Sequence, residues 1–458
     1  MQTPAFSGSG RRDLLKERRV QMEQANAHKN KSFVIRGNVY HTPASGAAET
    51  FERAFVVCRD GKCAGIFEEL PEEHRDLPLK DYGDALILPG MVDLHLHAPQ
   101  FAFRGTGMDS ELLTWLKERT FPEEEKYADP AYARRAYGMF VARMRQSATT
   151  RAVIFATIHK EATITLMELM EETGLVSYVG KVNMDRDAPP GLKEKTPLIS
   201  AYDTIDWIDD LRTQYHFTHT WPIITPRFIP CCSDSLLEYL GEVRRLYDLP
   251  VQSHLSENPE EMKLVESLMP DAAFYGDGYD RFGLFGGEAR TVMAHCIYSP
   301  EEEVERMREK GVWIAHCPNS NMNLASGIAP VRHYLDKGMR IGLGSDVAGG
   351  QTVSIFRAVT DAVQVSKLYW RYLDRSAEPL SFAEAFYLAT RGGGSFFGSA
   401  GSFEKGYEFD AIVIDDSRAP HPQPMSVSER VERAFYLGLD RNCLIAKYAA
   451  GTGIRLED

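Results

Sequence analysis

The sequence has no long hydrophobic run and few cysteines, and each absence excludes a class of protein. No apolar segment approaches the ~20 residues that a membrane-spanning helix needs, and no secretory-signal pattern opens the chain. The seven cysteines are odd in number and irregularly spaced, which argues against a disulfide framework. These observations predict a soluble chain with reduced thiols, located in the cytoplasm.

Basic residues are outnumbered by acidic ones beyond the first residues. The 458 residues carry a formal net charge of −13, with 52 Lys and Arg against 65 Asp and Glu. Residues 1–32 hold seven Lys and Arg but three Asp and Glu, so residues 33–458 carry about −17. Such an acidic body disfavours nucleic acids and anionic membranes as partners. We interpret residues 1–32 as a polar N-terminal extension.

The chain shows two kinds of secondary-structure pattern, and they predict how it is organised. Short β segments separated by turn residues fill 33–90, and a similar texture returns in 404–458. Between them, strand patterns alternate with helical stretches, and eight predicted strands lie at 91–97, 149–158, 176–184, 221–225, 250–255, 291–298, 312–317 and 340–347. The spacing suits parallel crossovers. We therefore predict an α/β protein in which 91–403 form a (β/α)8 TIM barrel, and both chain ends build a small β-sandwich domain.

The first barrel strand, within PGMVDLHLH (89–97), carries two histidines in otherwise apolar surroundings. Side chains alternate along a strand, so Asp93, His95 and His97 share one face. The two histidine Cα atoms would lie about 6.6 Å apart, which lets both imidazoles reach one ion. Taken alone, the pair fits a buried structural role as well as it fits metal binding.

Further polar residues gather where barrel strands end, which is where catalytic residues of such barrels lie. His254 ends the fifth strand, His295 lies late in the sixth and Asp346 ends the eighth. Three imidazoles and a carboxylate around an open position are typical of a catalytic Zn²⁺ site, and Fe²⁺ is compatible. From the residues alone, Asp346 could bind the ion, accept a proton from its water, or do both.

Glu257 follows His254 by three residues, just beyond the strand end. A carboxylate there could shuttle protons beside the metal without binding it. The alternative is a solvated loop residue with no role in chemistry.

Several longer strings resemble a known enzyme family. They are HLHAPQ (95–100), GMDSELLTWLKERTFPEEE (107–125), GKVNMDRD (180–187), TPRF (225–228), HLSE (254–257), AHCPNSNMNLASG (315–327) and GLGSDVAGG (342–350). With PGMVDLHLH, His295 and Asp346, they resemble the amidohydrolase superfamily and, within it, the guanine deaminase family. The resemblance covers roughly residues 33–458.

The resemblance implies roles for particular side chains. The matched zinc ligands are His95, His97, His254 and Asp346. Glu257 matches the proton shuttle, and His295 matches a neighbour of the metal-bound water, so Glu257, Asp346 and His295 are the expected catalytic residues. The expected substrate contacts are His97, Gln100, Arg227, Phe228, His254, Glu257 and Asp346. No lysine stands where a second metal would need one, so one zinc ion per chain is expected, and the family implies a homodimer.

The implied reaction converts guanine to xanthine and ammonia. Arg227 can donate to the purine O6 and N7 atoms, Gln100 offers an amide to a ring edge, and Phe228 can cover the flat face. Alternatives remain: Arg227 could be an ion-pair residue and Phe228 a core residue. The substrate could be another heterocycle, such as 8-oxoguanine or a triazine, and a non-catalytic barrel scaffold is a further possibility.

Overall fold

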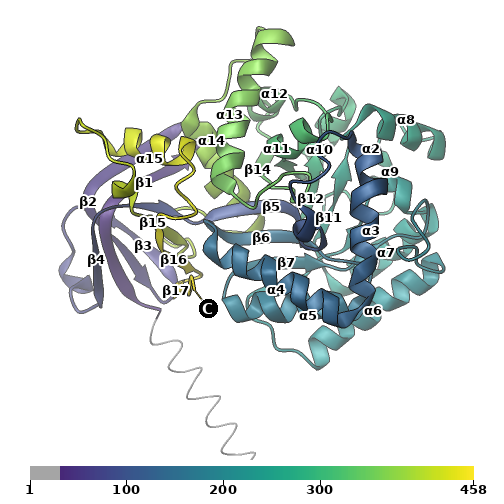
Figure 1. The fold of residues 1–458 in the computed structure, drawn as a ribbon, viewed down its shortest axis with the longest axis horizontal. Helices are drawn as coiled ribbons and strands as arrows, with labels where there is room; N and C mark the ends of the chain where they lie inside the picture. The colour runs from purple at the N-terminus through teal and green to yellow at the C-terminus, as the bar shows by residue number, and fades with distance from the viewer. Residues whose placement is uncertain (1–30, 458) are drawn as a thin grey trace, which may run out of the picture.

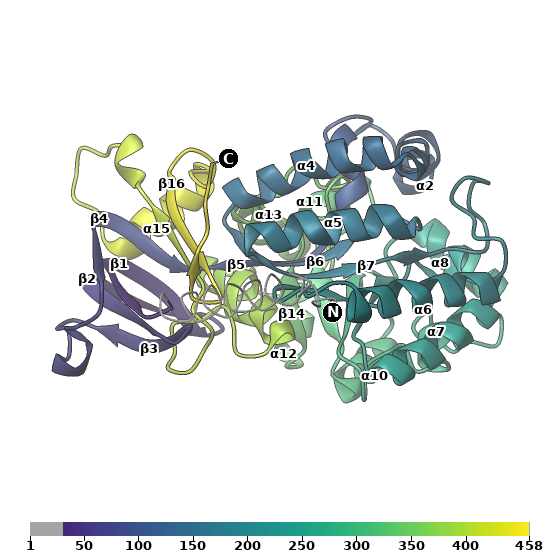
Figure 2. The ribbon, with the colours of Figure 1, turned by 90° about the horizontal axis from the view of Figure 1, so that it is seen from below.

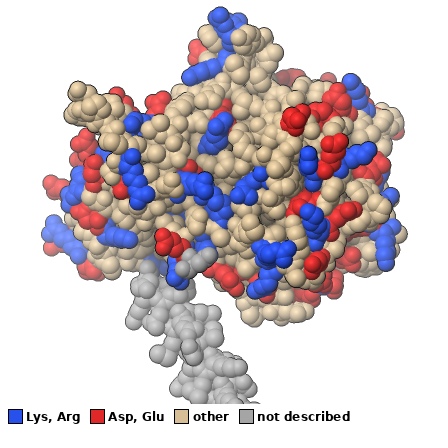
Figure 3. Space-filling view, viewed as in Figure 1, with Lys and Arg blue, Asp and Glu red and all other residues tan. Residues whose placement is uncertain are grey.

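The computed structural model describes residues 31–457, so most of the predicted extension 1–32 lies outside the described residues. The chain has the predicted mixed α/β character, with a β-rich part beside a larger part in which strands and helices alternate (Figure 1). Within 31–457, no helix is long and apolar enough to cross a membrane. On the face in Figure 3, acidic and basic side chains are interspersed over both parts.

Strands from both ends of the chain pair into one seven-stranded sheet, in the order β17-β16-β15-β4-β1-β2-β3. They are β1 (Phe33–Ala44), β2 (Ala47–Arg59), β3 (Lys62–Phe67), β4 (Leu79–Pro89), β15 (Ala411–Ile414), β16 (Leu444–Ala449) and β17 (Thr452–Gly453). Lys62 in β3 forms a backbone bridge with Glu408, just before β15. The strands predicted for the sandwich thus pair in a single sheet, and apolar residues from it, including Val56 and Val413, share one buried cluster.

Eight parallel strands of three or more residues occupy the middle of the chain, and each overlaps one of the eight predicted strands. They are β5 (Met91–His97), β6 (Thr149–Phe155), β7 (Val176–Gly180), β9 (Thr220–Pro222), β11 (Val251–Leu255), β12 (Thr291–His295), β13 (Trp313–His316) and β14 (Arg340–Leu343). They pair as two four-stranded sheets, β5-β6-β7-β9 and β11-β12-β13-β14. Backbone hydrogen bonds join these sheets at both seams, from Gln252 N to Ile224 O at 3.0 Å and from Asp346 N to His95 O at 2.8 Å. The two sheets therefore adjoin along both edges, with the carboxyl ends of their strands at the same end.

Helices pack around the outside of these strands (Figure 2). The α-helices are α2 (Leu112–Trp115), α3 (Phe121–Glu124), α4 (Pro130–Gln146), α5 (Lys160–Thr173), α6 (Pro197–Thr213), α7 (Asp234–Tyr247), α8 (Pro259–Leu268), α9 (Asp277–Asp280), α10 (Glu301–Lys310), α11 (Pro318–Asn323), α12 (Val331–Asp336), α13 (Ile355–Tyr372), α14 (Phe382–Tyr387) and α15 (Val427–Tyr436). In α4, Asp129 caps the first turn and Pro130 occupies its first position, both favourable there. Its buried residues Ala133, Tyr137, Phe140 and Met144 recur at helical spacing, which directs one face into the core.

A buried ion pair fastens the seven-stranded sheet to the parallel strands. Arg151 in β6 donates through Nε and Nη2 to the Asp410 carboxylate, and through Nη2 to Glu408 Oε2 at 2.6 Å. Both Arg151 and Asp410 are buried. Asp410 also accepts the Ala450 N–H at 2.7 Å, so it connects three segments of the chain.

Arg151→Met is expected to lower the free energy of unfolding by about 3–5 kcal/mol, because it leaves the buried Asp410 carboxylate without its cation. Urea unfolding followed by fluorescence measures the loss. Arg151→Met/Asp410→Asn, which removes both charges, should recover part of it. A loss of stability no larger than that of a surface substitution would show that this pair does not hold the two parts together.

Candidate active site

The carboxyl ends of β5, β11, β12 and β14 bring the predicted histidines and aspartate together. His95 and His97 lie on β5, His254 on β11, His295 at the end of β12 and Asp346 just after β14. All five side chains are buried. The backbone of His295 (φ 74°) and Asp346 (φ 45°) is left-handed, a conformation that costs free energy in non-glycine residues and is often found at functional sites.

The side-chain atoms of this cluster converge on a common point. His95 Nε2 lies 3.2 Å from Asp346 Oδ1, and His97 Nε2 lies 3.5 Å from the same oxygen. The Nε2 atoms of His97 and His254 are 3.2 Å apart. The ligand atoms of His95, His97 and His254 lie within 4.8 Å of one another, as do those of His95, His295 and Asp346. All four predicted zinc ligands are therefore neighbours, with His295 beside them.

The chemistry of these donors fits a divalent metal ion. His254 Nδ1 lies 2.6 Å from the carbonyl oxygen of Arg227, so Nδ1 carries the hydrogen and Nε2 presents a lone pair to the cluster. His95 Nε2 is buried and makes no well-aligned hydrogen bond among residues 31–457, although Asp346 Oδ1 lies 3.2 Å away. Burial lowers the pKa values of His95, His97 and His254, which favours the neutral imidazole that binds metals. Although burial opposes ionisation of Asp346, the adjacent histidines hold its pKa below the usual range.

Glu257 lies beside the cluster, two residues after β11. Its Oε2 is 3.4 Å from His295 Nε2, and its Oε1 accepts a hydrogen bond from Ser326 Oγ at 2.9 Å. Burial, the largest cause, raises the pKa of Glu257 to about 7, a range suited to accepting and returning a proton near neutral pH. Glu257 is only 4% exposed, so the alternative of a solvated loop residue is wrong.

Asn321, which no sequence pattern singled out, contacts the Nδ1 side of the His295 ring. Asn321 Oδ1 lies 2.9 Å from His295 Nδ1, which leaves His295 Nε2 to face the carboxylates of Glu257 and Asp346, the latter at 3.8 Å. Burial lowers the pKa of His295, but these carboxylates outweigh burial and raise it above the ordinary value. His295 is therefore suited to donate a hydrogen bond into the pocket.

The predicted purine-contact residues line the same pocket as the histidines. Gln100 lies in a 3₁₀ turn, Ala98–Phe103, directly after β5, and Arg227 and Phe228 follow the short strand β10 (Thr225–Pro226), which pairs with β8 (Val182–Asn183). The pocket is completed by apolar residues and a glycine: Leu112, Trp115, Leu116, Leu324 and Gly349. Phe228 also packs in an apolar cluster, so the core interpretation and the pocket interpretation both apply to it.

Glu124, the last residue of α3, connects Gln100 to Arg227. Its carboxylate accepts from Arg227 Nη1 at 2.5 Å and Nη2 at 3.2 Å, and from Gln100 Nε2 at 2.9 Å. The ion-pair alternative for Arg227 is thus confirmed, although Arg227 also lines the pocket. The sequence string containing Glu124 carried no signal for this contact.

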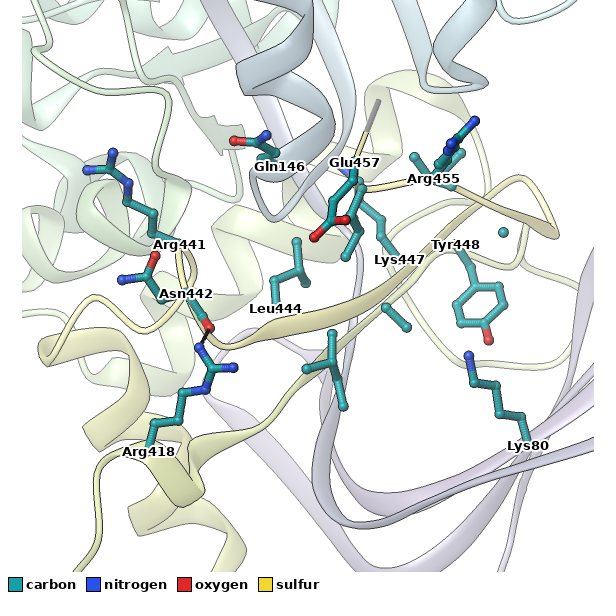
Figure 4. Close-up of a pocket in the computed structure, with 15 residues that line it drawn as sticks. Lys80, Gln146, Arg418, Arg441, Asn442, Leu444, Lys447, Tyr448, Arg455 and Glu457 are labelled. Atoms are coloured by element: carbon teal, nitrogen blue, oxygen red, sulfur yellow. Dashed lines mark hydrogen bonds between the residues drawn. The ribbon is translucent and has the colours of Figure 1, made fainter.

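A larger hollow lies beside β16 and β17, and most of the charged side chains that line it are basic (Figure 4). Its charged residues are Lys80, Arg418, Arg441, Lys447, Arg455 and Glu457. Lys447 is buried and donates to three backbone carbonyls at 2.9 to 3.1 Å, while Arg418 donates to the Asn442 carbonyl at 2.6 Å. Neither group of potential metal ligands found among residues 31–457 lies there, so the pocket at the strand ends is the candidate active site.

Comparison with known proteins shows which family the chain resembles over most of its length. Residues 86–443 match the amidohydrolase family. Guanine deaminase from Dictyostelium discoideum is 35% identical over 446 residues, which cover 92% of this chain and 98% of the relative. Guanine deaminase from Mus musculus is 39% identical over 385 residues, which cover 81% and 83% of the two chains.

A solved structure gives the same relationship in three dimensions. The guanine deaminase from C. acetobutylicum, with guanine bound in its active site, superposes with a TM-score of 0.89 and 44% sequence identity, covering 93% of this chain and 100% of that one. These matches confirm the resemblance seen in the sequence motifs. The chain belongs to the amidohydrolase family and, within it, to the guanine deaminase family.

Proposed function

We propose that this protein catalyses the hydrolytic deamination of guanine to xanthine and ammonia, a step in purine catabolism and salvage. One observation carries the proposal: the purine-contact candidates Gln100 and Arg227 line the same pocket as Glu257 and four members of the histidine–aspartate cluster, His97, His254, His295 and Asp346. The guanine bound in the active site of the C. acetobutylicum relative supports this choice of substrate.

We infer that one zinc ion per chain is held by His95, His97, His254 and Asp346, which together form a donor set typical of catalytic zinc. Fe²⁺ would suit the same donors. When bound, zinc supplies a nucleophile at neutral pH by lowering the pKa of a coordinated water to about 7.

The chain's own residues move the protons and hold the ring. Guanine carries at C2 the amine that water replaces, so one water is consumed and one ammonia leaves. Glu257 takes a proton from the attacking water and delivers it to ring N3 as the oxygen adds to C2. The second proton of that water then passes from the added oxygen to the amine, the C2–N bond breaks, and ammonia leaves. His295, between Glu257 and Asp346, donates a hydrogen bond to the attacking oxygen and fixes its approach.

Arg227 and Gln100 bind the opposite side of the purine. Their N–H groups donate to O6 and N7, and the Phe228 ring covers the flat face. These contacts place C2 beside the nucleophile. The apolar residues Leu112, Trp115 and Leu324 exclude bulk water from the pocket, which strengthens the polar contacts made there.

Two architectural assignments accompany this function. We propose that 91–403 form a (β/α)8 barrel that carries the site, and that 33–90 and 404–458 form a β-sandwich domain beside it. By family resemblance we also expect a cytoplasmic homodimer, which light scattering after size-exclusion chromatography would test.

The purified protein is expected to contain about one zinc ion per chain, because the pocket offers one set of four ligands. His254→Ala should lose most of the metal, since it removes one ligand of the four. Elemental analysis of the dialysed protein measures the content. Two metal ions per chain at full occupancy would contradict the single-metal assignment.

A panel of heterocycles tests the substrate assignment. Ammonia release should be fastest with guanine and slower with 8-oxoguanine, a triazine and a pyrimidine. If another heterocycle is preferred, the enzyme class stands but the guanine assignment fails. If none is deaminated by protein of known zinc content, the non-catalytic scaffold is the better description.

A further inference from the structure

We propose that Glu124 is a positioning residue: it orients Gln100 and Arg227 so that both present only hydrogen-bond donors to the purine. The pocket thereby selects 6-oxopurines over 6-aminopurines. The inference rests on the proposed function. It begins with the orientation of one amide, Gln100.

Both ends of the Gln100 amide contact groups of fixed polarity. Gln100 Nε2 donates to Glu124 Oε1 at 2.9 Å, and a carboxylate can only accept. Gln100 Oε1 accepts from the Ala348 backbone N–H at 3.2 Å, which can only donate. Turning the amide over would oppose two acceptors at one end and two donors at the other. Gln100 is therefore held with its oxygen occupied and its second N–H free for a ligand.

Glu124 also fixes Arg227. The two carboxylate oxygens accept from Nη1 and Nη2 of the guanidinium, and the guanidinium carbon lies 5.3 Å from the centroid of the Phe121 ring. Arginine has five N–H donors and no acceptor, so the contacts with Glu124 leave further donors for the pocket. Glu124, Gln100 and Arg227 are each no more than 3% exposed, so water cannot readily replace these contacts.

The consequence is a recognition surface that offers N–H groups from two side chains, both oriented by one carboxylate. A purine with acceptors at O6 and N7 complements it. A 6-amino group would point its own N–H bonds at these donors and leave buried donors unsatisfied, which is a strong basis for rejection. Guanine and 2,6-diaminopurine share the C2 amine and N3, and they differ at position 6 and in the hydrogen that guanine carries at N1.

The test compares kcat/KM for guanine and 2,6-diaminopurine in the wild type and in Glu124→Gln. An amide at position 124 can donate as well as accept, so Gln100 is free to turn over and Arg227 loses its charged partner. The preference for guanine should fall at least about tenfold, mainly through a higher KM for guanine. Zinc content should stay unchanged.

Glu123→Gln is the matched control. Glu123 is the preceding residue of α3 and is also buried, but its carboxylate bonds to Lys126 and Tyr132 instead. The control should keep the wild-type preference. An equal loss with both substrates in Glu124→Gln would mean that Glu124 acts only on the fold, and would overturn the inference.

Two further outcomes are separable from this one. If the wild type releases no ammonia from guanine, the proposed function fails before Glu124 is tested. If Glu124→Gln does not fold, competitive inhibition of the wild type by hypoxanthine and by adenine takes its place as the test. Neither purine carries the C2 amine, so each can bind without being deaminated there. Hypoxanthine should inhibit more strongly, and equal inhibition would overturn the donor-only surface.

Discussion

Glu257→Gln is expected to lower the turnover of guanine by about 10²–10⁴-fold, the usual effect of removing a general acid–base group. Glutamine has the same shape as glutamate but cannot take up the proton of the attacking water and pass it to N3. The variant should keep its fold, its zinc and much of its affinity for guanine. Steady-state kinetics measure turnover and KM for guanine, and elemental analysis of the same sample measures its zinc content.

A matched control separates this role from a general effect of charge. Glu260 lies three residues further along, and its side chain is 57% exposed, so Glu260→Gln should leave turnover unchanged. If Glu257→Gln with full zinc releases ammonia at a near-normal rate, the shuttle assignment ends. The protons would then have to pass through Asp346 and His295.

Arg227→Ala is expected to weaken both guanine use and the fold. Losing one charged hydrogen bond to the substrate suggests a fall in kcat/KM worth about 1.5–3 kcal/mol. The variant also leaves the Glu124 carboxylate buried without its cation, which suggests a loss of unfolding free energy of about 3–5 kcal/mol. Zinc should remain bound, because Arg227 contacts His254 only through its backbone carbonyl.

The two effects can be separated with a second variant. Arg227→Met/Glu124→Gln removes both buried charges, so it should regain much of the stability lost in Arg227→Ala while guanine use stays poor. Urea unfolding and steady-state kinetics follow the two properties. Unchanged kcat/KM in Arg227→Ala would remove Arg227 from substrate binding, and unchanged stability would show that Glu124 does not need its partner.

The histidine cluster was predictable because its signals are local. His95 and His97 alternate with apolar residues along one strand, so the sequence alone places them on one face. His254 and Asp346 stand at the ends of predicted strands and His295 lies late in another, and parallel strands of one barrel end on the same side. Their meeting therefore follows from the topology, which eight strand patterns of suitable spacing indicated.

The contacts of Glu124 were not predictable, because nothing local distinguishes it from its neighbours. Three glutamates follow one another at 123–125, and Glu123 is buried like Glu124 but bonds elsewhere. Which carboxylate reaches Arg227 depends on how α3 is set over the pocket, which is a tertiary property. The link from Arg151 to Asp410 is similar, since it joins residues 259 positions apart.

The central claim is that this pocket hydrolyses guanine, and an isotope experiment tests it most directly. The full chain, with its zinc content measured, is incubated with guanine in water enriched in ¹⁸O, and xanthine and ammonia are quantified together. We expect one ammonia for each xanthine, and one ¹⁸O atom in each xanthine at C2. Zinc-loaded protein that forms no ammonia from guanine, or xanthine without the solvent oxygen, would contradict the account.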